Sequence, residues 1–98
     1  MLVKIHESYR TTVSICDSDI IDKKYEEEKL QIDLRGAFFK GEEKTPEETK
    51  EIIKDMQCED ATFNIVGKES CAVALEMKII KQEGIITIQG IPISLVLL

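Results

Sequence analysis

The sequence predicts an α+β fold in two layers, in which a mixed sheet of five or six strands carries two main helices packed on one face. Two observations support this fold. Short runs rich in β-branched residues predict strands at both ends and in the middle of the chain. Two helix-forming stretches, one opened by Thr-Pro-Glu-Glu and one strongly apolar, separate those strands. With 98 residues, the chain is expected to be a single domain over residues 1–98.

The first two strands are expected at residues 2–6 and 11–17, where apolar and polar side chains alternate. Placing apolar residues opposite one another puts Ile5 across from Val13, with a short loop between the strands. His6 then becomes a solvent-facing strand residue with no nucleophile beside it, which argues against a catalytic role.

The next segment contains three aspartates in six residues, Asp17, Asp19 and Asp22. Carboxylates in such a group favour a hard metal ion, but the central glycine and closing glutamate of a calcium loop are missing. We therefore expect a polar turn in which Asp17 or Ser18 caps a short helix that begins near Asp19.

The middle of the chain is expected to hold a solvated acidic run, one strand and one helix. Residues 26–28 are all glutamate, and residues 30–35 alternate as in a strand with one buried face. One of the adjacent phenylalanines, Phe38 or Phe39, is expected to fold back into the core. Residues 45–48 form a capping box with proline at the first helical position, so a covering helix is predicted to about Gln57.

The stretch at 61–81 is expected to organise the core. Residues 61–66 predict a buried strand that ends at Gly67, and residues 69–81 predict a helix that is apolar over more than half its surface. After this helix, a strand is expected at 85–88, a bend at 90–92 and a final apolar strand at 93–98.

The turn at Gly67 is the candidate site. A helix that starts directly after a strand leaves backbone N–H groups and a positive dipole end facing outward, which suits an anion. The segment is not a phosphate-binding P-loop, because it lacks the second glycine and the Lys-Ser or Lys-Thr pair. The alternative is that Gly67 only allows a tight bend and that Ser70 caps the helix. With the second glycine corner, the predicted ligand-binding residues are Asn64, Gly67, Lys68, Ser70, Gly90 and Pro92.

The sequence predicts no metal site, no cofactor and no catalytic residues, so an enzyme is the less favoured class. Cys16, Cys58 and Cys71 form no Cys-x-x-Cys pair and are expected to be reduced thiols. Cys71, placed just inside a helix start, is the one candidate for a reactive thiol, and a small buried apolar residue is the alternative.

Composition limits the partners. The net charge of −6 disfavours general nucleic-acid binding, although a local contact with one or two phosphates is compatible with it. No apolar run is long enough for a membrane span, and the N-terminus lacks the pattern of a signal peptide, so a cytoplasmic location is expected. The carboxyl end is apolar to its last residue, which is typical of a buried strand or of a homodimer contact.

The order of four short motifs resembles the archaeal domain-of-unknown-function family 424. These are a Cys-Asp turn, Phe-Phe-Lys-Gly, Asn-Ile-Val-Gly before a helix and Ile-Gln-Gly-Ile-Pro near the carboxyl end. Their residues are Cys16, Asp17, Phe39, Gly41, Asn64, Gly67, Gly90 and Pro92. The resemblance implies no established activity, only a loose association with RNA or translation. In that family a histidine often follows the late proline and a glycine often follows the Cys-Asp turn, where this chain has Ile93 and Asp22.

Two hypotheses of different classes follow. The first is a small binding module that holds an anionic ligand, such as an RNA phosphate, at 64–70. The second is a protein-interaction or homodimerising module that uses the apolar C-terminal strand.

Overall fold

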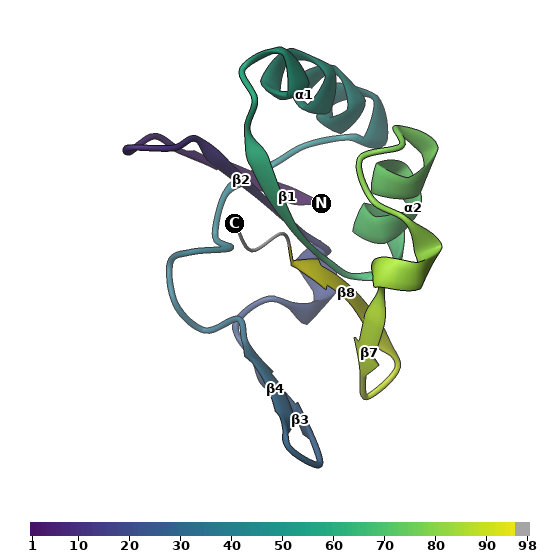
Figure 1. The fold of residues 1–98 in the computed structure, drawn as a ribbon. Coiled ribbons are helices and arrows are strands. Elements are labelled where there is room, and N and C mark those ends of the chain that lie inside the picture. The colour runs from purple at the N-terminus through teal and green to yellow at the C-terminus, as the bar shows by residue number, and fades with distance from the viewer. Residues whose placement is uncertain (96–98) are drawn as a thin grey trace.

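The computed structural model describes residues 1–95 as an α+β fold built on a mixed six-stranded sheet (Figure 1). The strands lie in the order β5-β1-β2-β6-β8-β7. Their bounds are β1 Leu2–His6, β2 Thr12–Cys16, β5 Glu42–Glu43, β6 Thr62–Val66, β7 Ile86–Ile88 and β8 Ile91–Leu95. The predicted fold class is therefore confirmed.

One parallel pair lies at the centre of this sheet. β2 and β6 run parallel, with Val13 beside Phe63 and Ile15 beside Ile65, while every other neighbouring pair of the sheet is antiparallel. The predicted hairpin is confirmed in register, because Ile5 lies opposite Val13 in β1 and β2.

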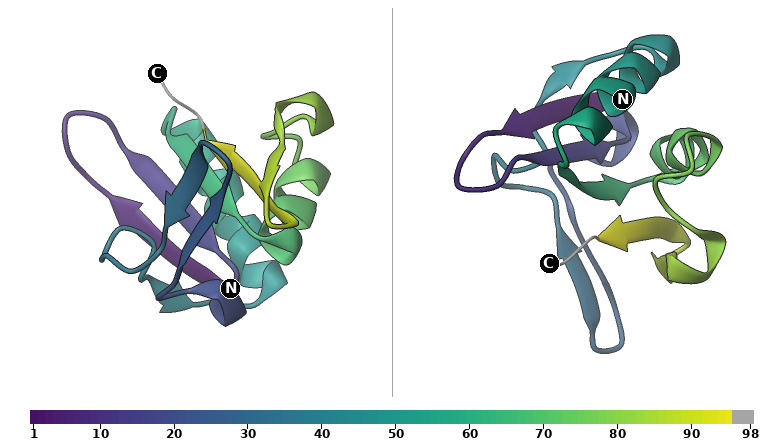
Figure 2. Two further views of the ribbon diagram at one scale, coloured as in Figure 1. Left: turned by 90° about the horizontal axis from the view of Figure 1, so that it is seen from below. Right: turned by 45° about the horizontal axis from the view of Figure 1, so that its top comes forward.

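Both helices pack on one face of the sheet, as the sequence predicts (Figure 2, right). They are α1 (Pro46–Cys58) and α2 (Lys68–Glu76). The capping box of α1 is complete: the Thr45 hydroxyl accepts from the Glu48 N–H, and the Glu48 carboxylate accepts from the Thr45 N–H. Between helices and sheet lies the main core, centred on fully buried Val13, Ile15, Ile53, Ile65 and Ala74.

A second hairpin and a connecting loop cover part of the opposite face. The hairpin is formed by β3 (Lys24–Glu27) and β4 (Leu30–Asp33), and it projects away from the sheet (Figures 1 and 2). Leu34 and Phe39 are buried there with strand residues Cys16, Val66 and Ile93 in a second core cluster. Phe39 is thus the phenylalanine that folds inward, whereas Phe38 stays exposed.

Two element predictions were wrong. Residues 24–27 form a strand, where the sequence predicted only a solvated acidic run at 26–28. Helix α2 ends at Glu76, five residues earlier than predicted, because Lys78 takes a left-handed conformation with φ 60°. The Lys78 and Ile79 N–H groups then donate to the Leu75 and Ala74 carbonyls, which closes the helix with a Schellman cap.

The short helix predicted near Asp19 is present as a single 3₁₀ turn, Ser18–Ile20. Neither Asp17 nor Ser18 caps that turn with its side chain, so this part of the prediction was wrong. The final apolar residues of the predicted C-terminal strand, 96–98, lie outside the described part of the chain. None of the helices in residues 1–95 has the length and apolarity needed to cross a membrane.

Candidate functional site

The two glycine corners predicted from the sequence do meet. The Gly67 N–H donates to the Pro92 carbonyl at 2.9 Å, where β6 runs into α2 beside β8. Gly90 lies two residues earlier, exposed in the β7–β8 turn with φ 78°. Lys68 is exposed at the first turn of the helix. Asn64 is half-buried in β6, where it lies between Ser14 of β2 and Leu95 of β8.

The amino end of α2 is occupied by the side chain of Asp17. Its carboxylate accepts from the Glu69 N–H at 3.0 Å, from the Ser70 N–H at 2.8 Å and from the Ser70 hydroxyl at 2.6 Å. Asp17 is only 6% exposed and Ser70 is fully buried. A negative charge at this place is favoured by the helix dipole and satisfies donors that have no partner inside the helix.

Gly67 is required here for two reasons. Its φ of 115° is a backbone conformation that side chains rarely adopt, and a Cβ at this position would lie 2.2 Å from Cγ of Asp17. The residue therefore supplies both the bend from β6 into α2 and the space for the carboxylate.

The expectation of an outward-facing helix start was therefore wrong. The backbone donors that would bind an anion already bind Asp17, a residue 52 or more positions away in the chain. Ser70 does contribute to the cap, but by donating its hydroxyl proton to Asp17 and not by accepting a backbone N–H. In residues 1–95, no three His, Cys, Asp or Glu side chains are grouped closely enough to hold a metal ion.

The two buried cysteines flank the same carboxylate. Burial, and then the negative charge of Asp17, raise the pKa of Cys16 from 9.0 to about 12 and that of Cys71 to about 11. Their thiols donate to backbone carbonyls, Cys16 to Asp17 and Cys71 to Pro92. Cys71 is thus a protonated core residue, which agrees with the alternative of a small buried apolar residue and not with a reactive thiol.

His6 has a hydroxyl beside it, which the sequence did not predict. Its Nε2 lies 3.2 Å from Oγ of Ser14 and 3.0 Å from the Phe38 carbonyl, and the imidazole stacks on the Phe38 ring at 4.4 Å between centroids. The Ser14 hydroxyl donates to the same carbonyl at 2.8 Å, and Ser14 is fully buried. This geometry fixes the 34–41 loop on the sheet and leaves the serine without access to a substrate.

An exposed apolar surface lies on the side of the sheet opposite the helices. Ile86 of β7 and Leu95 of β8 share this face, because Ile86 pairs with Ile93 and Leu95 lies two residues further along β8. Leu30 lies on the hairpin face that also carries Ile32, which packs against the second core cluster. Leu30, Ile86 and Leu95 are 46%, 49% and 41% exposed.

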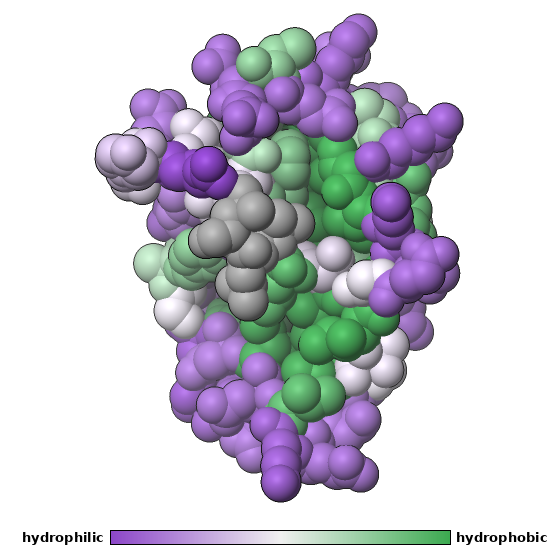
Figure 3. Space-filling view, in the orientation of Figure 1, coloured by the Kyte–Doolittle hydropathy of each residue, from purple (hydrophilic) through white to green (hydrophobic). Residues whose placement is uncertain are grey.

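We call Leu30, Ile86 and Leu95, with the strand residues between them, the β7–β8 surface. Figure 3 shows apolar side chains gathered across this part of the molecule. Polar groups border it near the hairpin, where the Gln89 N–H donates to the Glu27 carboxylate and the Gln89 side-chain amide donates to the Glu26 carbonyl.

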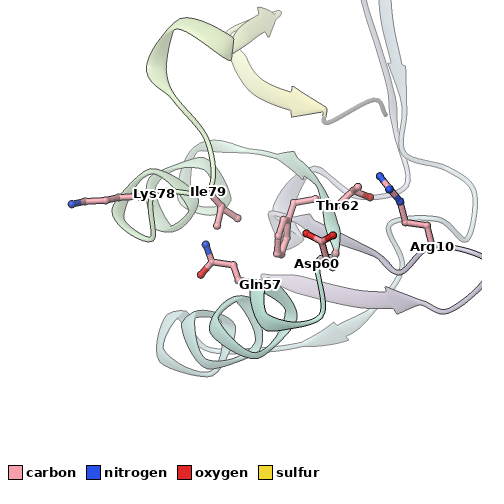
Figure 4. A pocket seen from close by; sticks show the side chains of 8 residues that line it. Arg10, Gln57, Asp60, Thr62, Lys78 and Ile79 are labelled. Atoms are coloured by element: carbon pink, nitrogen blue, oxygen red, sulfur yellow. The ribbon is translucent and has the colours of Figure 1, made fainter.

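A depression of about 620 Å³ lies elsewhere, between the carboxyl ends of α1 and α2 and the start of β6 (Figure 4). Its wall combines charged, polar and apolar side chains. They are Arg10, Gln57, Asp60, Ala61, Thr62, Phe63, Lys78 and Ile79. No part of the predicted site contributes to it. The depression was not predicted from the sequence, because its residues come from three separate segments, at 10, 57–63 and 78–79.

The arrangement of strands and helices defines a known α+β fold. The crystal structure of an uncharacterized conserved protein from Methanopyrus kandleri is similar with a TM-score of 0.83 and 18% sequence identity, over 94% of this chain and 85% of that one. The sequence profile of the family described as "Protein of unknown function (DUF424)" matches residues 6–97, and the chain belongs to that family. A search of curated proteins found no match.

Proposed function

We propose that this protein is an interaction module and that the β7–β8 surface is its contact with a second copy of the chain. The observation that supports this proposal is the exposure of three large aliphatic side chains, Leu30, Ile86 and Leu95, on one side of the molecule. Contiguous exposed apolar surface rimmed by polar groups is typical of protein contacts.

The charged residues at the edge of the β7–β8 surface favour a second copy of the chain as the partner. The hairpin tip carries Glu27, Glu28 and Lys29 next to Leu30, so it presents both signs of charge. A two-fold contact brings the same patch together with itself, and a mixed rim allows opposite charges to meet across the axis. Half-burying each aliphatic side chain contributes roughly 1 kcal/mol, so the three side chains of both copies contribute roughly 6 kcal/mol before the cost of association. The dimer is therefore expected to be weak and to form only at high protein concentration.

Sedimentation velocity at protein concentrations from about 5 to 500 μM tests the proposal. The wild-type protein is expected to shift from monomer to dimer over this range, and Leu30→Glu with Ile86→Glu is expected to stay monomeric. Ile5→Glu is the matched control, because Ile5 is 40% exposed but lies on β1, which is separated from β8 and β7 by β2 and β6 in the sheet. A wild-type protein that remains a monomer at 500 μM refutes the proposal, and so does a double variant that still dimerises.

The competing hypothesis is an anionic ligand, such as an RNA phosphate, at 64–70. Such a ligand would have to displace or approach the Asp17 carboxylate, and the like charges repel one another. We therefore expect inorganic phosphate and a short single-stranded RNA to leave the melting temperature and the amide resonances of 67–71 unchanged. Saturable shifts at those resonances would favour this hypothesis over the interaction module.

A further inference from the structure

The depression between the two helix ends combines opposite charges over an apolar floor. Figure 4 shows Asp60 and Arg10 on one side of the depression, with Gln57 and Ile79 on the other and Lys78 extending outward from the rim; Phe63 also lines it. Among the described residues, Arg10, Asp60 and Lys78 make none of the ion pairs within 4.0 Å. Charged groups of both signs are therefore available to a ligand.

Both helices that border the depression end without the glycine that usually follows the last helical turn. Each helix ends in a Schellman cap: Asp60 and Ala61 donate to the Gln57 and Met56 carbonyls, as Lys78 and Ile79 do in α2. The left-handed position, where glycine costs least, is filled by Asp60 at φ 58° and by Lys78 at φ 60°. The chain thus keeps two charged side chains at places where a residue without a side chain would stabilise the fold more.

From this we infer that the depression is a binding site for a small zwitterion of the free amino-acid type. The carboxylate of Asp60 would receive the ligand ammonium, the guanidinium of Arg10 would receive the ligand carboxylate, and Phe63 with Ile79 would contact an apolar side chain. The volume of about 620 Å³ is sufficient for such a molecule. This site is independent of the β7–β8 surface.

Titration of the ¹⁵N-labelled protein with L-leucine, followed by amide chemical shifts, tests the inference. Saturable shifts at residues 57–63, 78–79 and 10 are expected, with a dissociation constant of about 1 mM. Leucinamide, which lacks the carboxylate, and 4-methylpentanoate, which lacks the ammonium group, are each expected to bind at least about 10-fold more weakly.

Two glycine variants separate binding from stability. Asp60→Gly is expected to raise the melting temperature by about 2–6 °C and to weaken L-leucine binding at least 10-fold. Glu28→Gly is the matched control, because Glu28 is also left-handed at φ 56° but lies at the hairpin tip; it is expected to gain similar stability and to bind as the wild type does. Asp60→Asn, which retains the backbone conformation more readily, is expected to lose binding as well.

The inference is overturned if L-leucine at 20 mM causes no saturable shifts, or if the shifts cluster outside the depression. It is also overturned if Asp60→Asn binds with wild-type affinity, or if the amide or the deaminated probe binds as tightly as L-leucine.

Discussion

Replacing Asp17 tests directly what holds the junction of β2, β6 and α2 together. Asp17→Ala removes the acceptor for three donors: the N–H groups of Glu69 and Ser70 and the Ser70 hydroxyl. Because the site is buried, water does not replace the carboxylate freely, and each buried donor left without a partner costs about 1–3 kcal/mol. The hydroxyl can rotate to a new acceptor, and the two amides share one helix end, so the costs do not simply add.

We expect Asp17→Ala to lower the free energy of unfolding by about 3–4 kcal/mol, somewhat more than the loss of an ordinary helix cap. For a domain of this size this corresponds to a fall of about 15 °C in melting temperature. Asp17→Asn keeps one accepting oxygen but turns an amide N–H₂ toward donors, so we expect a loss of about 2 kcal/mol. Urea denaturation followed by circular dichroism measures both values.

Asp19→Ala is the matched control, because Asp19 lies in the following turn and is exposed. We expect it to change stability by less than about 0.5 kcal/mol. The reasoning is refuted if Asp17→Ala and Asp19→Ala are equally mild.

The Asp17→Ala protein also provides an independent readout. Its helix start is left with free donors, so added formate should raise its melting temperature more than that of the wild-type protein. An equal response of the two proteins would show that the carboxylate does not fill an anion site.

Further predictions concern single positions. Gly67→Ala should destabilise by roughly 3 kcal/mol or more in urea, because its Cβ overlaps the Asp17 carboxyl group; a change below 1 kcal/mol would contradict the packing. At pH 8 a thiol reagent should label exposed Cys58 rapidly, and Cys16 and Cys71 only upon unfolding, counted by mass spectrometry. The thiols of Cys16 and Cys71 ionise near pH 9.0 in the unfolded chain, but their pKa values in the folded protein are about 12 and about 11. The free energy of unfolding should therefore be unaffected by these thiols below pH 9 and should fall as the pH rises from 9 to 12. A protein with both Cys16→Ala and Cys71→Ala should lose less stability in that window. Thr45→Ala should cost about 1 kcal/mol through loss of the capping box, unlike Thr11→Ala in the β1–β2 loop. Asp22→Gly should raise the melting temperature by a few degrees, because Asp22 has φ 68°, and no change would show that its ion pair with Lys40 offsets the backbone cost.

Local patterns predicted the elements whose signals lie within a few residues. The capping box at Thr45 and the alternation around Ile5 and Val13 depend on neighbours three residues apart or on one hairpin. The position of Gly67 at a turn and its meeting with Pro92 were also predicted correctly.

The Asp17 contact could not be predicted in the same way, because it joins positions more than 50 residues apart. An aspartate after a strand is compatible with a local cap, a metal ligand or a distant helix end, and only the parallel pairing of β2 with β6 selects the last. The strand at 24–27 was also missed. Its hairpin projects from the sheet and its glutamates are exposed, so the strand has no buried face that would produce alternating apolar and polar residues in the sequence.

The end of α2 shows the limit of apolar patterning. Ile79 and Ile80 continue the helical periodicity, but the chain turns at Lys78 and buries Ile80 in the main core from a new direction. Periodicity reports which residues are buried, and here two different backbone paths bury the same residues.

The parallel pairing of β2 with β6 has a consequence for how the chain acquires its structure. Residues 12–16 can complete their place in the sheet only when residues 62–66 are present. At a translation rate of about 5–20 residues per second, the ribosome adds the intervening segment over roughly 2–10 s. During this interval the β1–β2 hairpin exposes Val13 and Ile15 to solvent, so we expect the nascent chain to depend on chaperone protection until β6 has left the exit tunnel.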